Sequence, residues 1–578
     1  MEYIIDHLNN ILNKAFDKCG YGKGFGNSKI SDRLDLCQFQ CNDAFLCAKK
    51  FHKSPLEIAN DISLYLSKNK IFNTVTVNPP GFINLSLSDE FLYNHVKNIY
   101  NDKNCGVPCL CKGETIIIDY GGANIAKALH IGHLRSAIIG ESLKRLARLA
   151  GANVISDAHL GDWGMQMGLV IAEYQERYPN WSCFHSQYNG DFASFPNVAV
   201  NELNEIYPYA SKKSKENVEF KDKANTITAK LQQGDCGYVD IWKKIVDTSI
   251  NDLKNNYQHL GVEFDYWYGE SHSAKYIPPL IKTLEEQNLL FKSEGASVVN
   301  VSFKDDKEPI PVVMIKKSDG SYTYATTDLA TIIQRKTDFR PNEIWYVVDQ
   351  RQSLHFKQVF RCAKLAQISN NIDLHHIGFG TMNGHDGKPY KTRDGGVMKL
   401  NDLINLAINT TKNGATNILD EKTYEKIAIA GIKFGDLINH RTKDYIFDVD
   451  KFTSSNGKTG VYLLYTLTRI NSILSKVNLK DIDFSFMNIS SDCERNILLD
   501  IVFSSIYFVR SIKEKAPNYI AESAYNIAVD FSKFYHETSI IHEPDSSKKS
   551  FKICLCLITK KVLEKHLEIL GIEPVEKM

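Results

Sequence analysis

The sequence lacks the features that mark membrane and secreted proteins. Among its 578 residues, no apolar run approaches the roughly 20 residues that a membrane helix needs. The first residues mix Asp6, His7, Asn9 and Lys14 with apolar side chains and hold no apolar core of a signal peptide. The 13 cysteines are odd in number and form no framework of pairs, which favours a reducing compartment. We therefore expect a cytoplasmic protein without a membrane segment.

Several motifs of metal and nucleotide sites are also missing. The closest cysteine cluster, Cys105, Cys109 and Cys111, lacks the CxxC spacing of a zinc ribbon. No stretch matches the P-loop GxxxxGK[ST] or the zinc-protease motif HExxH. We expect no protein-bound metal. The net charge of +1 neither demands nor excludes a nucleic-acid partner, because a neutral protein can carry a local basic stripe.

The chain is too long for one hydrophobic core, so we expect about three domains. Residues 1 to about 100 combine helical patterns with a hairpin pattern, "TVTVNPPGFINLSL" from Thr74, and predict a small α/β domain. From about residue 420 onward the pattern is mostly helical. Between them, residues 172–240 are polar and lysine-rich, which is typical of an insertion.

A βαβ unit is predicted at the start of the middle domain. "ETIIIDY", Glu114–Tyr120, is a β-branched run typical of a buried parallel strand. A glycine-containing loop follows, then a helix from about His133 to Ala150, then a second strand in "GANVISDAHLGDWG". In an open parallel sheet, ligands bind beyond the carboxyl ends of the strands, which is where this loop lies.

His130 and His133 occur at the end of that loop, where the helix begins. Free backbone N–H groups and the positive end of the helix dipole favour an anion there, and two imidazoles could help to hold nucleotide phosphates. Gly132 leaves room for a flat base against the backbone. The HxxH spacing alone is equally compatible with ordinary polar residues near a helix end.

Longer motifs in the chain resemble those of a known enzyme class. "GGANIAKALHIGHLRSAIIGESL" followed by "ISDAHLGDWGMQMG" resembles the catalytic core of class I aminoacyl-tRNA synthetases, with His130–His133 as the HIGH signature. "NIAK", "LGDWGMQ" and "DGKPYKTRDGG" resemble more closely the arginyl-tRNA synthetase family, as do "HLGVEFDYWYGES", "GVYLLYTLTRINSIL" and the ending "LGIEP". The resemblance extends over nearly the whole chain.

The resemblance implies an α/β fold with three domains. These are a small N-terminal α/β domain that contacts tRNA (1–108), a Rossmann-like parallel-sheet catalytic domain (109–440) with a helical insertion at about 172–270, and an all-helical anticodon-binding domain (441–578). It implies a monomeric arginine–tRNA ligase whose substrates are ATP with Mg²⁺, L-arginine and the tRNA for arginine. The arginine carboxylate would attack the α-phosphate of ATP, and a terminal tRNA hydroxyl would then attack the arginyl-adenylate.

The chemistry of arginine fits acids in this chain. A planar guanidinium is recognised best by carboxylates in bidentate geometry. Asp119 ends the "ETIIIDY" strand, and Asp328 lies four residues after Tyr324, so a helix there would place Tyr324 and Asp328 on one face. The resemblance assigns all three, with Asn124 and Gln352, to arginine binding. Members of that family often have glutamate at the position of Asp119.

Other roles are implied in the same way. The resemblance makes His130, His133 and Lys127 the catalytic residues, and it places ATP against Asn124, Gly132, His130, His133, Gly380, Met382, Lys391 and Arg393. The second lysine of the class-typical KMSKS loop is missing from "PYKTR", and Lys127 is expected to supply that charge. For tRNA we expect Tyr462, Tyr465 and Arg469 at helical spacing, with Gln38, Gln40 and Asn42 in a polar loop suited to base edges.

Three alternatives stay open on the sequence alone. The chain could be a class I relative that charges another amino acid, a nucleotidyltransferase of the same fold, or an inactive tRNA-binding paralogue. Asp119 together with Asp328 favours a cationic substrate. The presence of His130, His133, Asn124 and Lys127 argues against an inactive paralogue.

Overall fold

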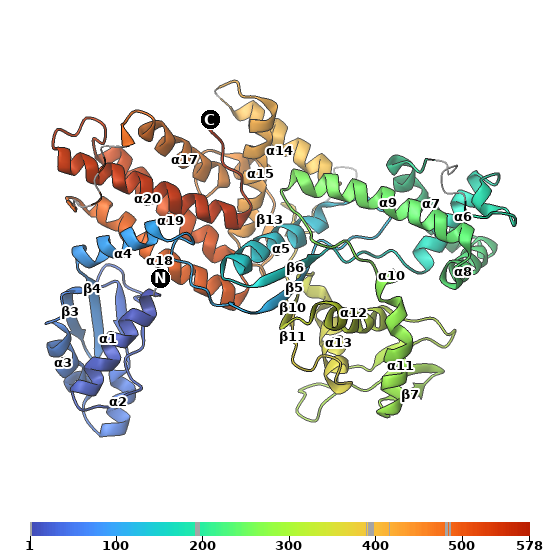
Figure 1. The fold of residues 1–578 in the computed structure, drawn as a ribbon, viewed down its shortest axis with the longest axis horizontal. Coiled ribbons are helices and arrows are strands. Elements are labelled where there is room, and N and C mark those ends of the chain that lie inside the picture. Colours follow the sequence, from blue (N-terminus) through green and yellow to red (C-terminus); the bar gives the residue numbers. More distant parts are fainter. Residues whose placement is uncertain are drawn as a thin grey trace. The chain divides into compact units, whose positions relative to one another are not determined.

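The computed structural model describes residues 3–190, 197–388, 390, 398–415, 417–479, 482, 484 and 487–578. It divides into two compact units (Figure 1). The first comprises Met1–Leu110, Ala415–Phe434 and Phe452–Met578, and the second comprises Cys111–Gly414 and Gly435–Lys451. Within the described part of the chain, every helix is too short or too polar to span a bilayer.

The first unit begins with a four-stranded antiparallel sheet in the order β1-β2-β4-β3. The expected hairpin is confirmed, because β3 and β4 pair on either side of Pro79, Pro80 and Gly81. The elements of this part are α1 (Ile4–Lys18), β1 (Ser28–Ile30), β2 (Phe39–Cys41), α2 (Ala44–Phe51), α3 (Pro55–Leu66), β3 (Phe72–Asn78), β4 (Phe82–Leu87) and α4 (Asp89–Asn101).

The expectation of one polar loop through Gln38, Gln40 and Asn42 is wrong at Gln40, and Gln38 and Asn42 directly flank its strand. Gln40 lies inside strand β2, where Phe39 and Cys41 are fully buried and set the alternation of the strand. Gln38 is buried, and its Oε1 accepts a hydrogen bond of 2.9 Å from the backbone N–H of Leu87. Gln40 donates to Asn84 on the neighbouring strand at 3.0 Å. These amides are therefore engaged in sheet structure.

The rest of the first unit is helical, as the sequence predicts. Its helices share one hydrophobic core with the sheet: the rings of Phe39 and Phe503 lie 5.7 Å apart, and Arg495 pairs with Asp89 at 2.8 Å. The helices are α17 (Gly460–Leu474), α18 (Asp492–Glu514), α19 (Asn518–Glu537) and α20 (Ser546–Leu570); α15 (Glu421–Leu437) and α16 (Val449–Thr453) span the boundaries between the units.

The second unit contains the predicted βαβ arrangement within a parallel sheet in the order β11-β10-β5-β6. Helix α5 connects β5 to β6. The inner strands β5 and β10 are short and mostly buried, as the β-branched run predicts for β5. The elements are β5 (Thr115–Asp119), α5 (Ile131–Leu149), β6 (Asn153–Asp157), β10 (Glu343–Tyr346) and β11 (Asp373–His376), with α12 (Tyr324–Phe339), η4 (Gln350–Gln352) and α13 (Ser353–Leu365) around them.

A group of helices is inserted between β6 and the later strands. Helices α6 to α9 pack against one another, and α9 is the long green helix in Figure 1. They are α6 (Met165–Arg177), η1 (Ser182–Phe184), α7 (Val200–Glu216), α8 (Val218–Gln233) and α9 (Cys236–His259). The remaining elements are α10 (Glu270–Ser273), η3 (Ala274–Tyr276), α11 (Ile277–Glu286), the antiparallel β7 (Leu290–Ser293), β8 (Ala296–Val299) and β9 (Val313–Lys316), the pair β12 (Met382–Asn383) and β13 (Tyr445–Ile446), and α14 (Leu400–Gly414).

Candidate active site

A row of polar residues crosses the carboxyl edge of the parallel sheet. The register places Tyr346 at the end of β10 beside Asp119 at the end of β5, and Asp119 beside Asp157 at the end of β6. Arg335 reaches this row from α12, and its guanidinium donates to Asp119 at 2.7 Å and to Asp157 at 2.9 Å. Asp119 therefore has a cationic partner inside the protein, which sequence reasoning missed.

The charges in this row are strongly coupled. Burial raises the pKa of Asp119, and the nearby Arg335 opposes that rise only in part. Burial also acts to raise the pKa of Asp157, but His159 and Arg335 outweigh it and hold that pKa below its usual value. The ring of His159 lies 3.7 Å from Asp157. The row is thus a buried cluster of compensated charges.

The two histidines form a reciprocal cap at the start of α5. Nδ1 of His130 accepts the backbone N–H of Gly132, and Nδ1 of His133 accepts the backbone N–H of His130, both at 3.1 Å. Because a neutral imidazole that accepts at Nδ1 carries its proton at Nε2, each ring presents an N–H donor at its other nitrogen. The rings lie 4.0 Å apart, centre to centre.

Both histidines are uncharged near neutral pH. Burial lowers the pKa of His130, and the charge of Lys127 lowers it further. Burial, with His130 and Lys127 nearby, lowers the pKa of His133 to about 3. The pair can therefore donate hydrogen bonds to an anion without taking up a proton, while Lys127, exposed on the preceding loop, carries the fixed charge.

Gly132 makes the histidine cap possible. A Cβ at residue 132 would lie 2.8 Å from Cε1 and 2.9 Å from Nδ1 of His130, so any larger residue would displace the ring. From the sequence, we predict that Gly132 leaves room for a nucleotide base. In the structure, the atoms that occupy the space beside its missing side chain are those of His130.

The segment around residues 380–400 is fastened to the same helix. Backbone hydrogen bonds of 3.0 Å join Ile131 to Met398 and Leu400 to Leu129. The buried Arg135 of α5 donates to the carbonyl of Gly380 at 2.7 Å and pairs with Asp436 at 2.9 Å. Gly380 is thus held by the side chain of Arg135, and Met382 nearby in the chain is buried. Lys391 and Arg393 lie outside the described residues.

Three of the residues expected to bind arginine lie on α12 or on η4. The stretch from Tyr324 is helical, so Tyr324 and Asp328 stand one turn apart, as predicted. Oδ2 of Asp328 lies 2.6 Å from Nε2 of His355 on α13. Tyr324 is 76% exposed, and Gln352 is exposed at the end of η4. No local sequence pattern predicts the contact between Asp328 and His355.

A second acid, Glu270, belongs to this group and was missed. It begins α10, a helix packed against α12, within the quoted motif "HLGVEFDYWYGES". Burial raises its pKa to about 7, the charges of Asp328 and Asp162 add to that rise, and His159 opposes it. The charge of Glu270 is also felt at Tyr324. Tyr324, Asp328 and Glu270 are therefore close enough to interact electrostatically, and we call them the acidic cluster.

Asn124 lies on the loop between β5 and α5. It is exposed and forms a bridge with Gly161, whose Cβ, if present, would lie 2.3 Å from Oδ1 of Asn124. Among the described residues, no three His, Cys, Asp or Glu side chains are grouped so as to hold a metal ion.

The residues expected for tRNA in the first unit form an aromatic and cationic surface on α17 and α19. The guanidinium of Arg469 lies between the rings of Tyr465 and Tyr535, at 4.6 and 4.4 Å. Tyr462 lies one turn earlier on α17, and its ring is 5.8 Å from that of Tyr525. Tyr465 and Tyr535 are partly exposed, so their rings are accessible for stacking.

Comparison with known families and structures agrees with this architecture. Residues 95–449, more than half of the chain, match the family described as tRNA synthetases class I (R), catalytic domain. Residues 2–87 match the arginyl tRNA synthetase N terminal domain, and residues 463–578 match the DALR anticodon binding domain. The parallel sheet, the histidine cap and these matches define a class I aminoacyl-tRNA synthetase.

Relatives that match over their full length show which family of class I synthetases the chain belongs to. The chain is 45% identical to arginine–tRNA ligase of Alkaliphilus oremlandii over 591 residues and 41% identical to that of Agathobacter rectalis over 597 residues, each covering all of both chains. The arginyl-tRNA synthetase structure from Plasmodium falciparum superposes with a TM-score of 0.82 at 27% identity over the whole of both chains. That from Thermus thermophilus, at a TM-score of 0.77 and 18% identity, shares the fold. The chain belongs to the arginyl-tRNA synthetase family.

Proposed function

We propose that this chain activates arginine with ATP and then transfers the arginyl group to its tRNA. In the first step, an oxygen of the arginine carboxylate attacks the α-phosphate of ATP, and pyrophosphate leaves. In the second, a hydroxyl of the terminal tRNA ribose attacks the arginyl carbonyl carbon, and AMP leaves. The observation that carries this proposal is the match of the entire chain to arginine–tRNA ligases.

On the nucleotide side, we assign the α-phosphate and the adenine-ribose face to the Nε2–H groups of His130 and His133. Their neutral rings offer donors that need no reorganisation, and Lys127 adds the positive charge expected of the missing loop lysine. Mg²⁺ is proposed to arrive with the ATP phosphates. The other proposed nucleotide contacts are Asn124, Gly132, Gly380, Met382, Lys391 and Arg393.

On the arginine side, Asp328 is the principal proposed partner of the guanidinium. His355 engages its Oδ2, and within the described residues no hydrogen bond occupies its Oδ1. Tyr324 and Glu270 complete the acidic cluster around the guanidinium. Asn124 is assigned to the α-amino and carboxyl groups of arginine, and Gln352 to the pocket. Asp119 stays a proposed partner through its Oδ1, because Arg335 occupies Oδ2.

For tRNA, we propose stacking of bases on the surface of Tyr462, Tyr465 and Arg469, and contact with the segment around β2 that carries Gln38, Gln40 and Asn42. Aromatic rings and guanidinium planes are the groups that hold unstacked RNA bases. We also propose that the enzyme acts as a monomer in the cytoplasm, where its tRNA is found.

The test of this function is pyrophosphate exchange into ATP, measured with each of the twenty amino acids in the presence of total tRNA. We expect exchange with arginine alone, followed by arginine-dependent acylation of tRNA. Exchange with another amino acid would replace the proposed substrate. Binding of tRNA without exchange would indicate an inactive paralogue.

Replacing Lys127 with alanine should lower the rate of arginine activation by roughly 100-fold, because a charge that meets the phosphates in the transition state is lost. Arginine binding should change less than twofold, since Lys127 is proposed to meet the phosphates and not the arginine side chain. Pyrophosphate exchange gives the rate and calorimetry gives the binding constant. Equal losses in both would contradict the role.

Arginine binding should strengthen as the pH rises through 7. Glu270 is partly protonated there, since its pKa is raised to about 7, and a nearby guanidinium favours the carboxylate, so binding releases a proton. The expected fall in the KM for arginine between pH 6 and pH 8 is about tenfold. Glu270→Gln should flatten this profile. A profile that stays steep in the variant would assign the titration to another group.

A further inference from the structure

The loop that carries Lys127 contains a strained residue. Ala126 has a φ of +60°, in the left-handed region that residues with a side chain rarely adopt. Ile125 and Ala126 are buried, whereas Asn124 and Lys127 on either side are exposed. Such a conformation persists only where the surroundings hold it, so the contacts of this loop decide where Lys127 lies.

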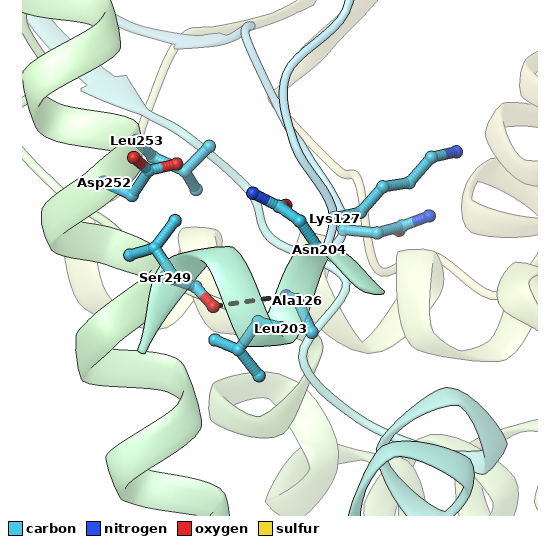
Figure 2. A pocket seen from close by; sticks show the side chains of 9 residues that line it. Ala126, Lys127, Leu203, Asn204, Ser249, Asp252 and Leu253 are labelled. Carbon is cyan, nitrogen blue, oxygen red and sulfur yellow. Dashed lines mark hydrogen bonds between the residues drawn. The ribbon is translucent and has the colours of Figure 1, made fainter. Parts of the chain in front are cut away.

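Two side chains hold the same peptide group of this loop. The carbonyl of Ile125 accepts a hydrogen bond of 2.6 Å from Nε2 of Gln166 on α6. The N–H of Ala126, at the other end of that peptide group, donates to Oγ of Ser249 on α9 at 3.2 Å (Figure 2). With its C=O and its N–H both fixed, the peptide plane cannot rotate, and its orientation sets φ of Ala126.

On the side of Ser249, the buried part of the loop borders a small pocket. This pocket lies between the loop, α7 and α9. Asn124, Ala126, Lys127, Ser249 and Asp252 are among the residues that line it, as Figure 2 shows for those it labels. The hydroxyl of Ser249 holds this peptide from the pocket side, in addition to the burial of Ile125 and Ala126 and the backbone hydrogen bond of 3.1 Å from Ile125 to Gly161.

We propose that Ser249 and Gln166 are positioning residues for activation: they clamp the Ile125–Ala126 peptide and thereby aim Lys127 at the nucleotide phosphates. The inference rests on the proposed role of Lys127. It also makes α6 and α9 of the helical insertion part of the machinery for the first step, in addition to any contact that they make with tRNA.

Ser249→Ala tests the clamp. The rate of arginine-dependent pyrophosphate exchange should fall about 10- to 100-fold, the range expected when a catalytic group is misplaced by about 1 Å. Arginine affinity by calorimetry should stay within twofold, and the melting temperature should hold. Thr248→Ala, which removes the neighbouring hydroxyl on the same helix, should leave the rate unchanged.

A second substitution distinguishes a backbone clamp from a structural role. Glycine adopts a positive φ without strain, so Ala126→Gly in the Ser249→Ala background should restore at least part of the lost rate. Gln166→Met should reproduce the loss seen in Ser249→Ala, and Ala126→Gly should relieve that loss too. A variant that is damaged through folding would not recover in this way.

The outcomes separate this inference from the function on which it rests. If Lys127→Ala loses activity but Ser249→Ala does not, the clamp is overturned and the proposed function stands. Loss in Ser249→Ala without rescue by Ala126→Gly also overturns the clamp. An unmodified protein that shows no arginine-dependent exchange overturns the proposed function first, and the clamp with it.

Discussion

Replacing Arg335 with methionine will destabilise the second unit by about 3–5 kcal/mol, because it leaves two buried carboxylates without their cation. Asp119 and Asp157 both receive hydrogen bonds from this guanidinium, and Arg335 itself is 1% exposed. In thermal unfolding we expect the transition of this unit to fall by about 10 °C. The loss should be smaller at low pH, where the carboxylates can take up protons.

The sign of that pH effect follows from linkage. Without Arg335, the pKa of Asp119 and of Asp157 rises above the value in the unfolded chain, so the folded form binds more protons and stability falls as pH rises. Arg351→Met provides a matched control, since its pair with Asp349 at 2.6 Å lies at the surface and should contribute less than about 1 kcal/mol. Equal destabilisation by the two variants would contradict the assignment.

The sequence predicts the parts of this fold that follow from local patterns. A β-branched run bounded by polar residues becomes β5, and the 3.6-residue recurrence of leucine and isoleucine becomes α5. Proline and glycine mark the hairpin between β3 and β4. Tyr324 and Asp328 share a helix because their spacing is one turn.

The sequence does not predict contacts between distant segments. Arg335 lies 216 positions from Asp119, and no local pattern announces that its side chain will reach the sheet edge. Glu270 is one acid among many until the fold buries it beside Asp328. For the same reason the sequence predicts a loop at Gln40, although this residue lies in β2 and its side chain donates to Asn84 on the neighbouring strand.

The histidine pair joins a structural role to a proposed chemical one. Capping uses the Nδ1 atoms of His130 and His133 and so fixes the Nε2–H tautomer that can donate to a phosphate. The two interpretations of the HxxH spacing that the sequence left open are therefore compatible. The contact that satisfies the start of α5 also orients the donors.

Asp328→Asn should lower kcat/KM for arginine by roughly 100-fold or more, since loss of a charge-assisted contact with a bound cation costs about 3 kcal/mol. The amide keeps the size of the side chain and can still bond with His355, so the fold should be retained. The KM for ATP should change little, because Asp328 lies on α12 with Tyr324, another residue proposed to bind arginine and not ATP. Pyrophosphate exchange with arginine or ATP varied in turn measures both.

The preference for arginine over an uncharged analogue tests the role of Asp328 more directly. Citrulline carries a neutral urea in place of the guanidinium, so the ratio of kcat/KM for arginine to that for citrulline should fall steeply in Asp328→Asn, because the variant no longer favours a positive charge. Asp338→Asn, on the exposed part of the same helix, should leave this ratio unchanged. If Asp328→Asn loses activity while its preference between the two substrates is preserved, the carboxylate supports the structure of the pocket without reading the charge of the substrate. If the preference disappears with little change in the melting temperature, Asp328 reads that charge directly.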